Sequence, residues 1–360
     1  MAETKSTCCY CGVGCGVIIE HEAGRVVGVK GDPDHPANFG RLCTKGATLH
    51  FSAAPETLAV RALYPELRAN RNEARQRVSW DSALDTAVEK FAAIIQEHGP
   101  DAVAVYGAGQ LLTEDYYVFN KLMKGLIGSN NLDTNSRLCM SSAVAGYKLS
   151  LGADAPPCSY ADIADTQALF ITGSNTAFAH PITFRRVEDA RKANPEMKLV
   201  VIDPRRTDTA EAADLHLALM PGTDIALYNA MLHVMLWEGW IDRDYIEAHT
   251  EGFDALKKVV REYSPAMAAS ICGLDKKAIE QAAQIFATSK ATMSMYCQGL
   301  NQFSFGTHNN SALINLHLAT GQIGKPGAGP FSLTGQPNAM GGREVGGLAN
   351  LLSAHRDMAN

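Results

Sequence analysis

The sequence has few aromatic residues and no long hydrophobic run, and both absences limit what the chain can be. Aromatic residues make up 7% of the 360 residues. No stretch approaches the roughly 18 to 20 consecutive apolar residues that a membrane-spanning helix needs, so we expect no membrane span. Charge is also sparse: charged residues make up 19% and the net charge is −6. This balance argues against nucleic-acid binding and against a basic membrane-binding face.

The first residues, Met1 to Ser6, contain neither an apolar segment nor a twin-arginine pair. No export signal is therefore visible, and we expect a cytoplasmic protein. Hydrophobic residues make up 46% of the chain, which is ordinary for a globular protein of this length with two or three domains. Nine cysteines in a reducing compartment suit metal ligation better than disulfide bridges.

Four of these cysteines are concentrated near the amino terminus. Cys8, Cys11 and Cys15 are separated by two and three residues, and Cys43 follows after 27 more. Three thiolates this close in sequence can hold one face of a cubic iron–sulfur cluster, and a fourth can complete the ligand set. Structural zinc sites instead pair two CxxC units, or one CxxC with two histidines. The spacing therefore predicts a [4Fe-4S] cluster in preference to zinc, disulfides or unreactive thiols.

Beyond residue 58 the patterns of helices and strands alternate. A helix is expected to begin near Ser79 and to stop at Gly99, with an apolar strand over 102–106 after it. The clearest unit spans 168–203, where two buried strands flank a helix over about 182–193. Such a βαβ unit predicts parallel strands and an α/β fold, with a doubly wound, Rossmann-like parallel sheet.

Polar loops follow the strands of this unit. The loop from Gly173 to Pro181 joins a strand to a helix, a place where free backbone N–H groups can bind phosphate. Asp203 ends the next strand and could bind a ribose hydroxyl, and Asp224 could pair with a guanine edge. Ordinary βα loops with helix caps explain the same residues, so a nucleotide site and a purely structural role stay open here.

Three further features are ambiguous by themselves. Cys139 lies in a serine-rich run beside Arg137, which suits a reactive thiolate, although an inert buried cysteine fits as well. Lys45 follows Cys43 by two residues, where a cation would stabilise a reduced cluster, but surface lysines are common. Residues 321–347 hold nine glycines and three prolines, and they indicate backbone moulded around a ligand more than a flexible linker.

Taken together, these motifs resemble the molybdopterin oxidoreductases. The resemblance rests on the cysteine pattern through Gly46, on 135–140, 173–175, 222–224, 298–302 and 334–338, and it runs along essentially the whole chain. Within the superfamily the sequence is most similar to nitrate reductases of the assimilatory and periplasmic type. The resemblance implies one [4Fe-4S] cluster and molybdenum held by two molybdopterin guanine dinucleotides. It also implies a cluster module at 1–58, a discontinuous molybdopterin domain at 59–140 plus about 330–360, and a Rossmann-like dinucleotide domain at 141–329.

The resemblance assigns roles to individual residues. Cys139 would ligate molybdenum, Lys45 would lie on the electron path between cluster and pterin, and Arg343 is a candidate for attracting the anionic substrate. The other implied cofactor contacts are Gln110, Asn135, Thr172, Gly173, Ser174, Asn175, Thr176, Ala177, Phe178, Ala179, Asp203, Pro204, Arg205, Arg206, Thr207, Gly222, Thr223, Asp224, Gln298 and Gln302.

The activity that the resemblance implies is two-electron reduction of nitrate to nitrite, by oxygen-atom transfer to molybdenum with electrons delivered through the cluster. Ferredoxin, flavodoxin or an NAD(P)H-linked flavoprotein would be the electron donor. Formate dehydrogenase is the alternative, but those enzymes usually place a histidine after the metal ligand, where this chain has Met140. A non-catalytic iron–sulfur subunit would have no reason to keep Cys139. Family members continue well beyond residue 360, so we expect an amino-terminal portion that lacks the carboxyl-terminal domain closing over the cofactor.

Overall fold

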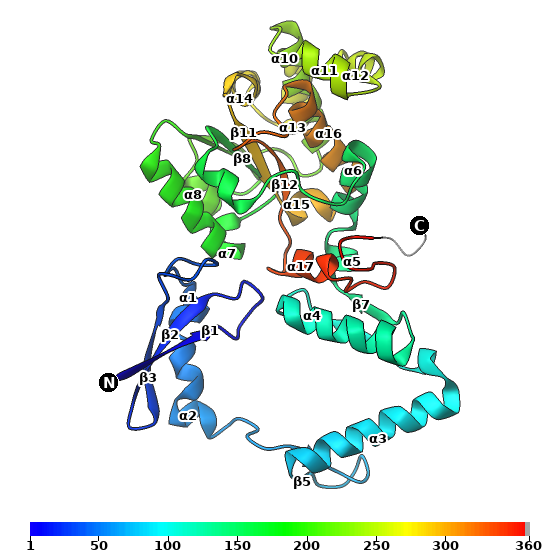
Figure 1. The fold of residues 1–360 in the computed structure, drawn as a ribbon. Coiled ribbons are helices and arrows are strands. Elements are labelled where there is room, and N and C mark those ends of the chain that lie inside the picture. The colour runs from blue at the N-terminus through cyan, green and yellow to red at the C-terminus, as the bar shows by residue number, and fades with distance from the viewer. Residues whose placement is uncertain (357–360) are drawn as a thin grey trace. The chain divides into compact units, whose positions relative to one another are not determined.

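The computed structural model describes residues 1–356, which divide into two compact units. The first comprises Met1–Asn135 together with the segment that begins at Gln336, and the second comprises Ser136–Gly335 (Figure 1). The finer division expected from the sequence, with a separate module at 1–58 and a discontinuous domain at 59–140 plus 330–360, stays a prediction. The last four residues of that predicted segment lie outside the described residues.

The first unit begins with an antiparallel sheet in the order β1-β2-β3. Strands β2 and β3 form a hairpin, and they pair on either side of Ala23 and Gly24, which both have positive φ angles. The elements of this part are β1 (Ala2–Thr7), β2 (Gly16–Glu22), β3 (Arg25–Gly31), α1 (Thr44–Ala47), the 3-10 helix η1 (Leu49–Ala53) and α2 (Pro55–Leu58).

The rest of the first unit is mainly helical. Ser79 caps the predicted helix, as its hydroxyl accepts a hydrogen bond from the Ser82 amide. The strand expected at 102–106 is shifted, because Pro100–Ala102 forms a 3-10 turn (η2) and pairing begins at Val105. The elements are β4 (Glu66–Leu67), β5 (Gln76–Arg77), α3 (Trp80–His98), β6 (Val105–Gly107), α4 (Thr113–Asn120), the π-helix η3 (Lys121–Ile127), β7 (Leu132–Thr134) and α17 (Ala339–Glu344).

The second unit contains a five-stranded sheet in the order β10-β9-β8-β11-β12, and every neighbouring pair is parallel. The strands are β8 (Ala168–Thr172), β9 (Lys198–Ile202), β10 (Leu215–Leu217), β11 (Thr292–Tyr296) and β12 (Gly329–Ser332). From β8 the chain adds β9 and β10 on one side, and it then returns to place β11 and β12 on the other. This reversal confirms the predicted doubly wound, Rossmann-like sheet and puts its switch point between β8 and β11.

Helices surround this sheet, and the strands are buried accordingly. All residues of β8, β11 and β12 are buried, as expected for a parallel sheet in an α/β protein. Phe170 of β8, Phe286 and His317 form an edge-to-face series that links the sheet to two helices. The helices are α5 (Ser136–Cys139), α6 (Ser141–Leu151), η4 (Tyr160–Ala164), α7 (Thr176–Ala179), α8 (Pro181–Ala193), α9 (Asp208–Glu211), α10 (Asp224–Trp237), α11 (Arg243–His249), α12 (Phe253–Val260), α13 (Pro265–Cys272), α14 (Lys276–Thr288), α15 (Gln298–Asn301) and α16 (Gly306–Ala319).

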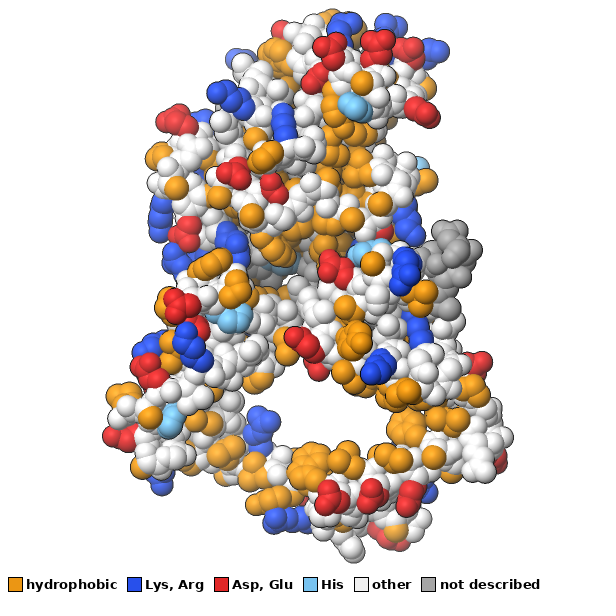
Figure 2. Space-filling model, viewed as in Figure 1, with side chains coloured by type: hydrophobic (Ala, Val, Ile, Leu, Met, Phe, Trp, Pro, Cys, Tyr) orange, Lys and Arg blue, Asp and Glu red, His pale blue; other side chains and the backbone are white. Residues whose placement is uncertain are grey.

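Helix α3 differs from the helices of the second unit because its apolar residues are exposed. Leu84, Val88 and Phe91 are each more than half exposed, and orange side chains are visible over the region of α3 in Figure 2. Its 19 residues include no buried side chain. None of the helices formed by residues 1–356 is both long enough and apolar enough to span a membrane.

Candidate functional site

The four amino-terminal cysteines lie on loops next to the small sheet. Cys8 directly follows β1 and Cys15 directly precedes β2, and the Cys8 amide donates a 2.9 Å hydrogen bond to the Cys15 carbonyl. Cys43 is the residue before α1. Burial, with smaller contributions from the neighbouring thiols of Cys11, Cys8 and Cys43, raises the pKa of Cys15 to about 12. The fold therefore brings Cys43 near the three cysteines at 8, 11 and 15, from the last of which it is separated by 27 residues in sequence.

Four thiols are the ligand set that a cubic iron–sulfur cluster takes. Among residues 1–356, no three His, Cys, Asp or Glu side chains are gathered as the ligands of one metal ion. A cubic cluster binds each thiolate through a different iron, so its ligands stand farther apart. Burial raises the pKa of the Cys8 thiol as well, and bound iron would reverse this by favouring thiolates. Lys45 is exposed in α1, close in sequence to Cys43, and its place on an electron path stays a prediction.

The switch point of the large sheet is formed by two glycines in close contact. Gly173 follows β8 with a φ of +57°, and the Gly299 amide donates a 2.9 Å hydrogen bond to its carbonyl. A Cβ atom on Gly299 would lie 2.6 Å from the Gly173 Cα, closer than real side chains come. Backbone groups, rather than side chains, therefore line the edge of the sheet here, as in folds that bind nucleotides at a switch point.

Cys139 lies beside this edge within the second unit. It is 5% exposed, and the Gln298 side chain approaches it with Nε2 2.6 Å from Sγ. Gly335 packs against both of these residues, because a Cβ atom there would lie 2.7 Å from Gln298 Nε2 and 3.5 Å from Cys139 Sγ. The structure therefore joins two predicted residues, Cys139 and Gln298, that lie 159 positions apart. A thiol is a soft ligand for transition metals, and Gly335 lets the backbone pass close to it.

The loop after β8 is organised by hydroxyl groups. The Ser174 and Thr176 hydroxyls lie 2.9 Å apart, and Thr209 donates to the Asn175 side-chain oxygen while accepting from the Ala177 amide. These bonds hold the predicted loop in one shape. Phe178, in contrast, is 77% exposed.

His180 is a buried polar residue of the loop from Gly173 to Pro181, and the sequence predicted no role for it individually. Its Nε2–H donates to the Thr334 carbonyl, which leaves Nδ1 as a hydrogen-bond acceptor. Nδ1 is buried and has no partner among residues 1–356, and burial lowers the pKa of the ring. A buried acceptor without a partner in the protein is available for a hydrogen bond from a bound group. The signal in the sequence was the His180-Pro181 step that ends the loop.

Two carboxylates lie at the same edge of the sheet. Asp203 and Asp224 are 7% and 8% exposed, and burial raises the pKa of Asp224 to about 6, with a smaller contribution from the charge of Asp203. Asp203 accepts a hydrogen bond from the Arg205 amide, and Thr172 shares a 2.6 Å hydrogen bond with Tyr228. A buried carboxylate with a raised pKa gains from a ligand N–H donor, which is what a guanine edge offers.

The remaining predicted residues are positioned by local contacts. A Cβ on Gly222 would lie 2.7 Å from the Phe303 ring, which brings the 222–224 turn to the segment that holds Gln302. Thr207 caps α9, and Arg206 pairs with Glu211 in an exposed salt bridge. In the first unit, Asn135 accepts a 2.6 Å hydrogen bond from the Gly109 amide, next to Gln110. Arg343 is 2% exposed in α17. The functional roles of all these residues stay predictions.

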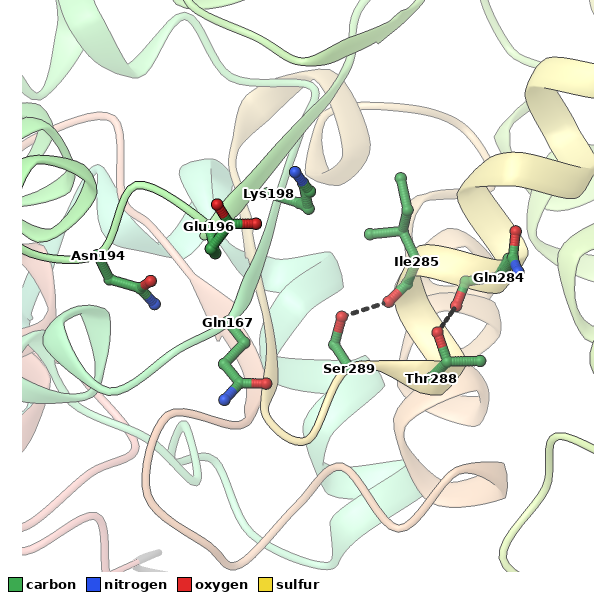
Figure 3. A pocket seen from close by; sticks show the side chains of 8 residues that line it. All are labelled: Gln167, Asn194, Glu196, Lys198, Gln284, Ile285, Thr288 and Ser289. Atoms are coloured by element: carbon green, nitrogen blue, oxygen red, sulfur yellow. Dashed lines mark hydrogen bonds between the residues drawn. The ribbon is translucent and has the colours of Figure 1, made fainter.

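A hollow of about 420 Å³ lies at the opposite, amino edge of the sheet (Figure 3). Gln167 and Lys198 stand there at the starts of β8 and β9, with Glu196 beside them and the end of α14 opposite. Thr288 and Ser289 donate back to carbonyls of their own helix. Ligands of open α/β sheets bind outside the carboxyl ends of the strands, so we place the functional site at the switch point and not in this hollow.

A four-thiol cluster module and a nucleotide-type switch point with a buried thiol define a class of protein: oxidoreductases that combine an iron–sulfur cluster with a nucleotide-related cofactor. Comparison with known proteins specifies the family. The family model for Molybdopterin oxidoreductase matches residues 61–359, and that for the Molybdopterin oxidoreductase Fe4S4 domain matches residues 1–54. The chain belongs to the molybdopterin oxidoreductase family. These matches indicate a molybdenum–molybdopterin cofactor and a [4Fe-4S] cluster.

Individual relatives agree with this assignment. The chain is 46% identical to a nitrate reductase of Synechocystis sp. and 49% identical to one of Klebsiella oxytoca, with 99% of the chain covered in each case. It is also 37% identical, over 97% of its length, to the F420-dependent formate dehydrogenase 1 subunit alpha of Methanococcus maripaludis. The chain spans 50%, 39% and 50% of these relatives.

A solved structure, acetylene hydratase from Pelobacter acetylenicus, superposes with a TM-score of 0.75 at 28% identity. It covers 90% of this chain, which corresponds to 44% of that protein. The similarity confirms the α/β architecture described above.

Proposed function

We propose that the protein reduces nitrate to nitrite. The observation that carries the proposal is the pair Cys139-Met140 at the switch-point site, together with nitrate reductase relatives at 46% and 49% identity. Bound there, the molybdenum cofactor would supply two-electron oxygen-atom transfer. The buried thiol of Cys139 suits a metal ligand, and Met140, 1% exposed, offers no proton acceptor beside it.

The chain's own residues would bind and orient the cofactor. In the loop from Thr172 to Ala179, the amides of Ser174 and Asn175 would be the donors to a pyrophosphate, because those of Gly173, Ala177 and Gly299 donate to other groups of the protein. Asp203 and Asp224 offer acceptors to a ribose hydroxyl and to a guanine edge, which favours the guanine dinucleotide form of the cofactor. His180 Nδ1 adds one buried acceptor. Gln298 would fix the position of the Cys139 side chain.

In the amino-terminal unit, Cys8, Cys11, Cys15 and Cys43 would hold the cluster, and Lys45 would lie on the electron path. Arg343 is proposed to attract the anion through its charge. Ferredoxin, flavodoxin or an NAD(P)H-linked flavoprotein would supply the electrons. We propose a cytoplasmic location because none of the nine cysteines, all of which lie within the described residues, forms a disulfide bond, which suits a reducing compartment.

Formate oxidation is the second candidate, and the relative at 37% identity favours it. Removal of a proton from formate needs a positioned acceptor near the metal ligand. Met140 occupies the position where formate dehydrogenases usually carry histidine. His180 keeps Nδ1 as a buried acceptor, but burial lowers the pKa of this ring and makes it a weaker base. Nitrate reduction is therefore the better supported proposal.

The test is a pair of assays on anaerobically purified protein whose iron, molybdenum and pterin contents have been measured. We expect about four irons per chain, together with molybdenum, and nitrite formation from nitrate with a reduced viologen. Dye reduction by formate, without nitrite formation, would transfer the assignment to formate dehydrogenase. Iron without molybdenum or pterin would contradict the assignment of the switch-point site.

A further inference from the structure

A hollow of about 180 Å³ opens between α10, α11 and α12. Its walls are apolar and aromatic, and three cationic side chains line it. The residues that line it are His233, Leu236, Trp237, Ile241, Arg243, Phe253, Lys257, Val260 and Arg261. The cofactor assignments above use none of them.

The aromatic wall is held in place by its own contacts. The rings of His233 and Trp237 are stacked in parallel, with centroids 4.6 Å apart and 3° between their planes. The His233 Nδ1–H donates to the Val260 carbonyl at 3.1 Å, which ties the end of α10 to the end of α12. Trp237 nevertheless remains 68% exposed. A rigid, largely exposed tryptophan over an apolar hollow is the kind of residue that dominates binding energy at protein interfaces.

The charged side chains that line this hollow are cationic, whereas Glu238, Asp244 and Glu262 are next to lining residues in the sequence but do not line it. Its lining, all within the described part of the chain, includes three cations and no carboxylate. Arg243 and Arg261 form no ion pair with other residues of 1–356, whereas Lys257 pairs with Asp254 at 3.3 Å. Asp242, which precedes Arg243, is used as the cap of α11. Two arginines are therefore available to a carboxylate on a molecule whose total charge, at −6, would otherwise repel acidic partners.

The size of the hollow decides what kind of ligand it takes. Pockets for cofactors and drug-sized molecules span roughly 300–1,000 Å³. At about 180 Å³ this hollow has room for one large side chain. We propose that it binds a short acidic segment of a protein partner, which inserts one aromatic or large aliphatic side chain beside Trp237 and places carboxylates on Arg243 and Arg261.

The proposal is tested by fluorescence anisotropy, with a labelled short peptide of aspartate and glutamate around one central phenylalanine. Binding to the cofactor-loaded protein is expected. Trp237→Ala is expected to weaken it by about tenfold or more, the usual effect of truncating a tryptophan at the centre of an interface. Arg243→Glu combined with Arg261→Glu should weaken it at least as much. Iron and molybdenum contents should stay unchanged, which shows that these variants fold.

Two matched variants serve as controls. Trp80→Ala removes a tryptophan that is 66% exposed in the other unit, and Lys258→Glu reverses an exposed charge on α12 that does not line the hollow. Both should bind the peptide like the unmodified protein. Equal binding of a peptide with alanine in place of phenylalanine would overturn the proposal, because it would show charge attraction alone. Tighter binding of single-stranded DNA, or a dimer that Trp237→Ala dissociates, would overturn it in favour of another partner.

Discussion

Asp224→Asn is expected to stabilise the cofactor-free protein at neutral pH. Asp224 is 8% exposed at the first position of α10, and burial raises the pKa of its carboxyl from 3.8 to about 6. The folded state therefore disfavours the ionised form. This rise in the pKa, by about two, lowers the free energy of unfolding by about 3 kcal/mol when the carboxyl is ionised. The penalty is absent below pH 3.8 and complete above pH 6. Asparagine cannot ionise, so it removes this penalty.

The measurement is the free energy of unfolding in urea, determined between pH 4 and pH 7 for both proteins without cofactor. The free energy of unfolding of Asp224→Asn should exceed that of the unmodified protein by near zero at pH 4 and by a few kcal/mol at pH 7, as the raised pKa of Asp224 predicts. Asp244→Asn is the control, because Asp244 lies in the first turn of α11 but is exposed. An advantage of Asp224→Asn that does not change with pH would refute the reasoning. In the loaded protein the same substitution should weaken retention of the guanine-bearing cofactor.

Three other substitutions probe the cluster, the switch point and the segment after α17. Cys11→Ala should remove the bound iron and the broad visible absorption, measured by iron analysis and spectroscopy. Gly299→Ala should cost about 1–3 kcal/mol of stability in urea unfolding, because the new methyl meets the Gly173 backbone. Lys124→Met should cost about 2 kcal/mol and expose residues 346–351 to proteolysis, because Lys124 Nζ donates to three carbonyls there at 2.6–2.8 Å.

Matched variants separate these effects from general damage. Cys9→Ala removes an exposed thiol beside Cys8 that does not belong to the predicted ligand set, and iron content should be unchanged. Gly125→Ala adds a methyl whose nearest neighbour is 4.0 Å away, so stability should be retained. Lys121→Met alters an exposed lysine at the start of η3, and proteolysis should not increase. Loss of iron in Cys9→Ala would count against the cluster assignment.

The parts of the fold that the sequence predicted best are those where local pattern and tertiary role agree. The buried strands at 168–172 and 198–202 are uniformly apolar, and the helix between them has clear periodicity, so their parallel pairing could be inferred. The strand near 105 was placed too early because Pro100 starts a 3-10 turn that apolar content alone does not reveal. Helix α3 was located correctly, yet periodicity could not show that its apolar face is exposed.

In the candidate site, too, features set by local sequence patterns were predictable and contacts between distant segments were not. The cysteine spacing predicted a cluster module from residues close in sequence. The contact between Cys139 and Gln298, and the Gly173–Gly299 contact, join segments more than 100 residues apart. No single-sequence pattern encodes such proximity, and only the family resemblance suggested that Cys139 and Gln298 share a site. His180 was omitted because an unpartnered buried nitrogen is a property of the fold and not of the sequence.

The most direct test of the account is the molybdenum spectrum of Cys139→Ala compared with that of the unmodified protein. Both proteins would be purified anaerobically and examined by X-ray absorption at the molybdenum edge, alongside nitrite formation from nitrate. We expect the variant to keep its iron, to lose one protein sulfur ligand at molybdenum, and to lose nitrate turnover. An unchanged molybdenum spectrum with full nitrate reduction would contradict the assignment of Cys139 as the metal ligand.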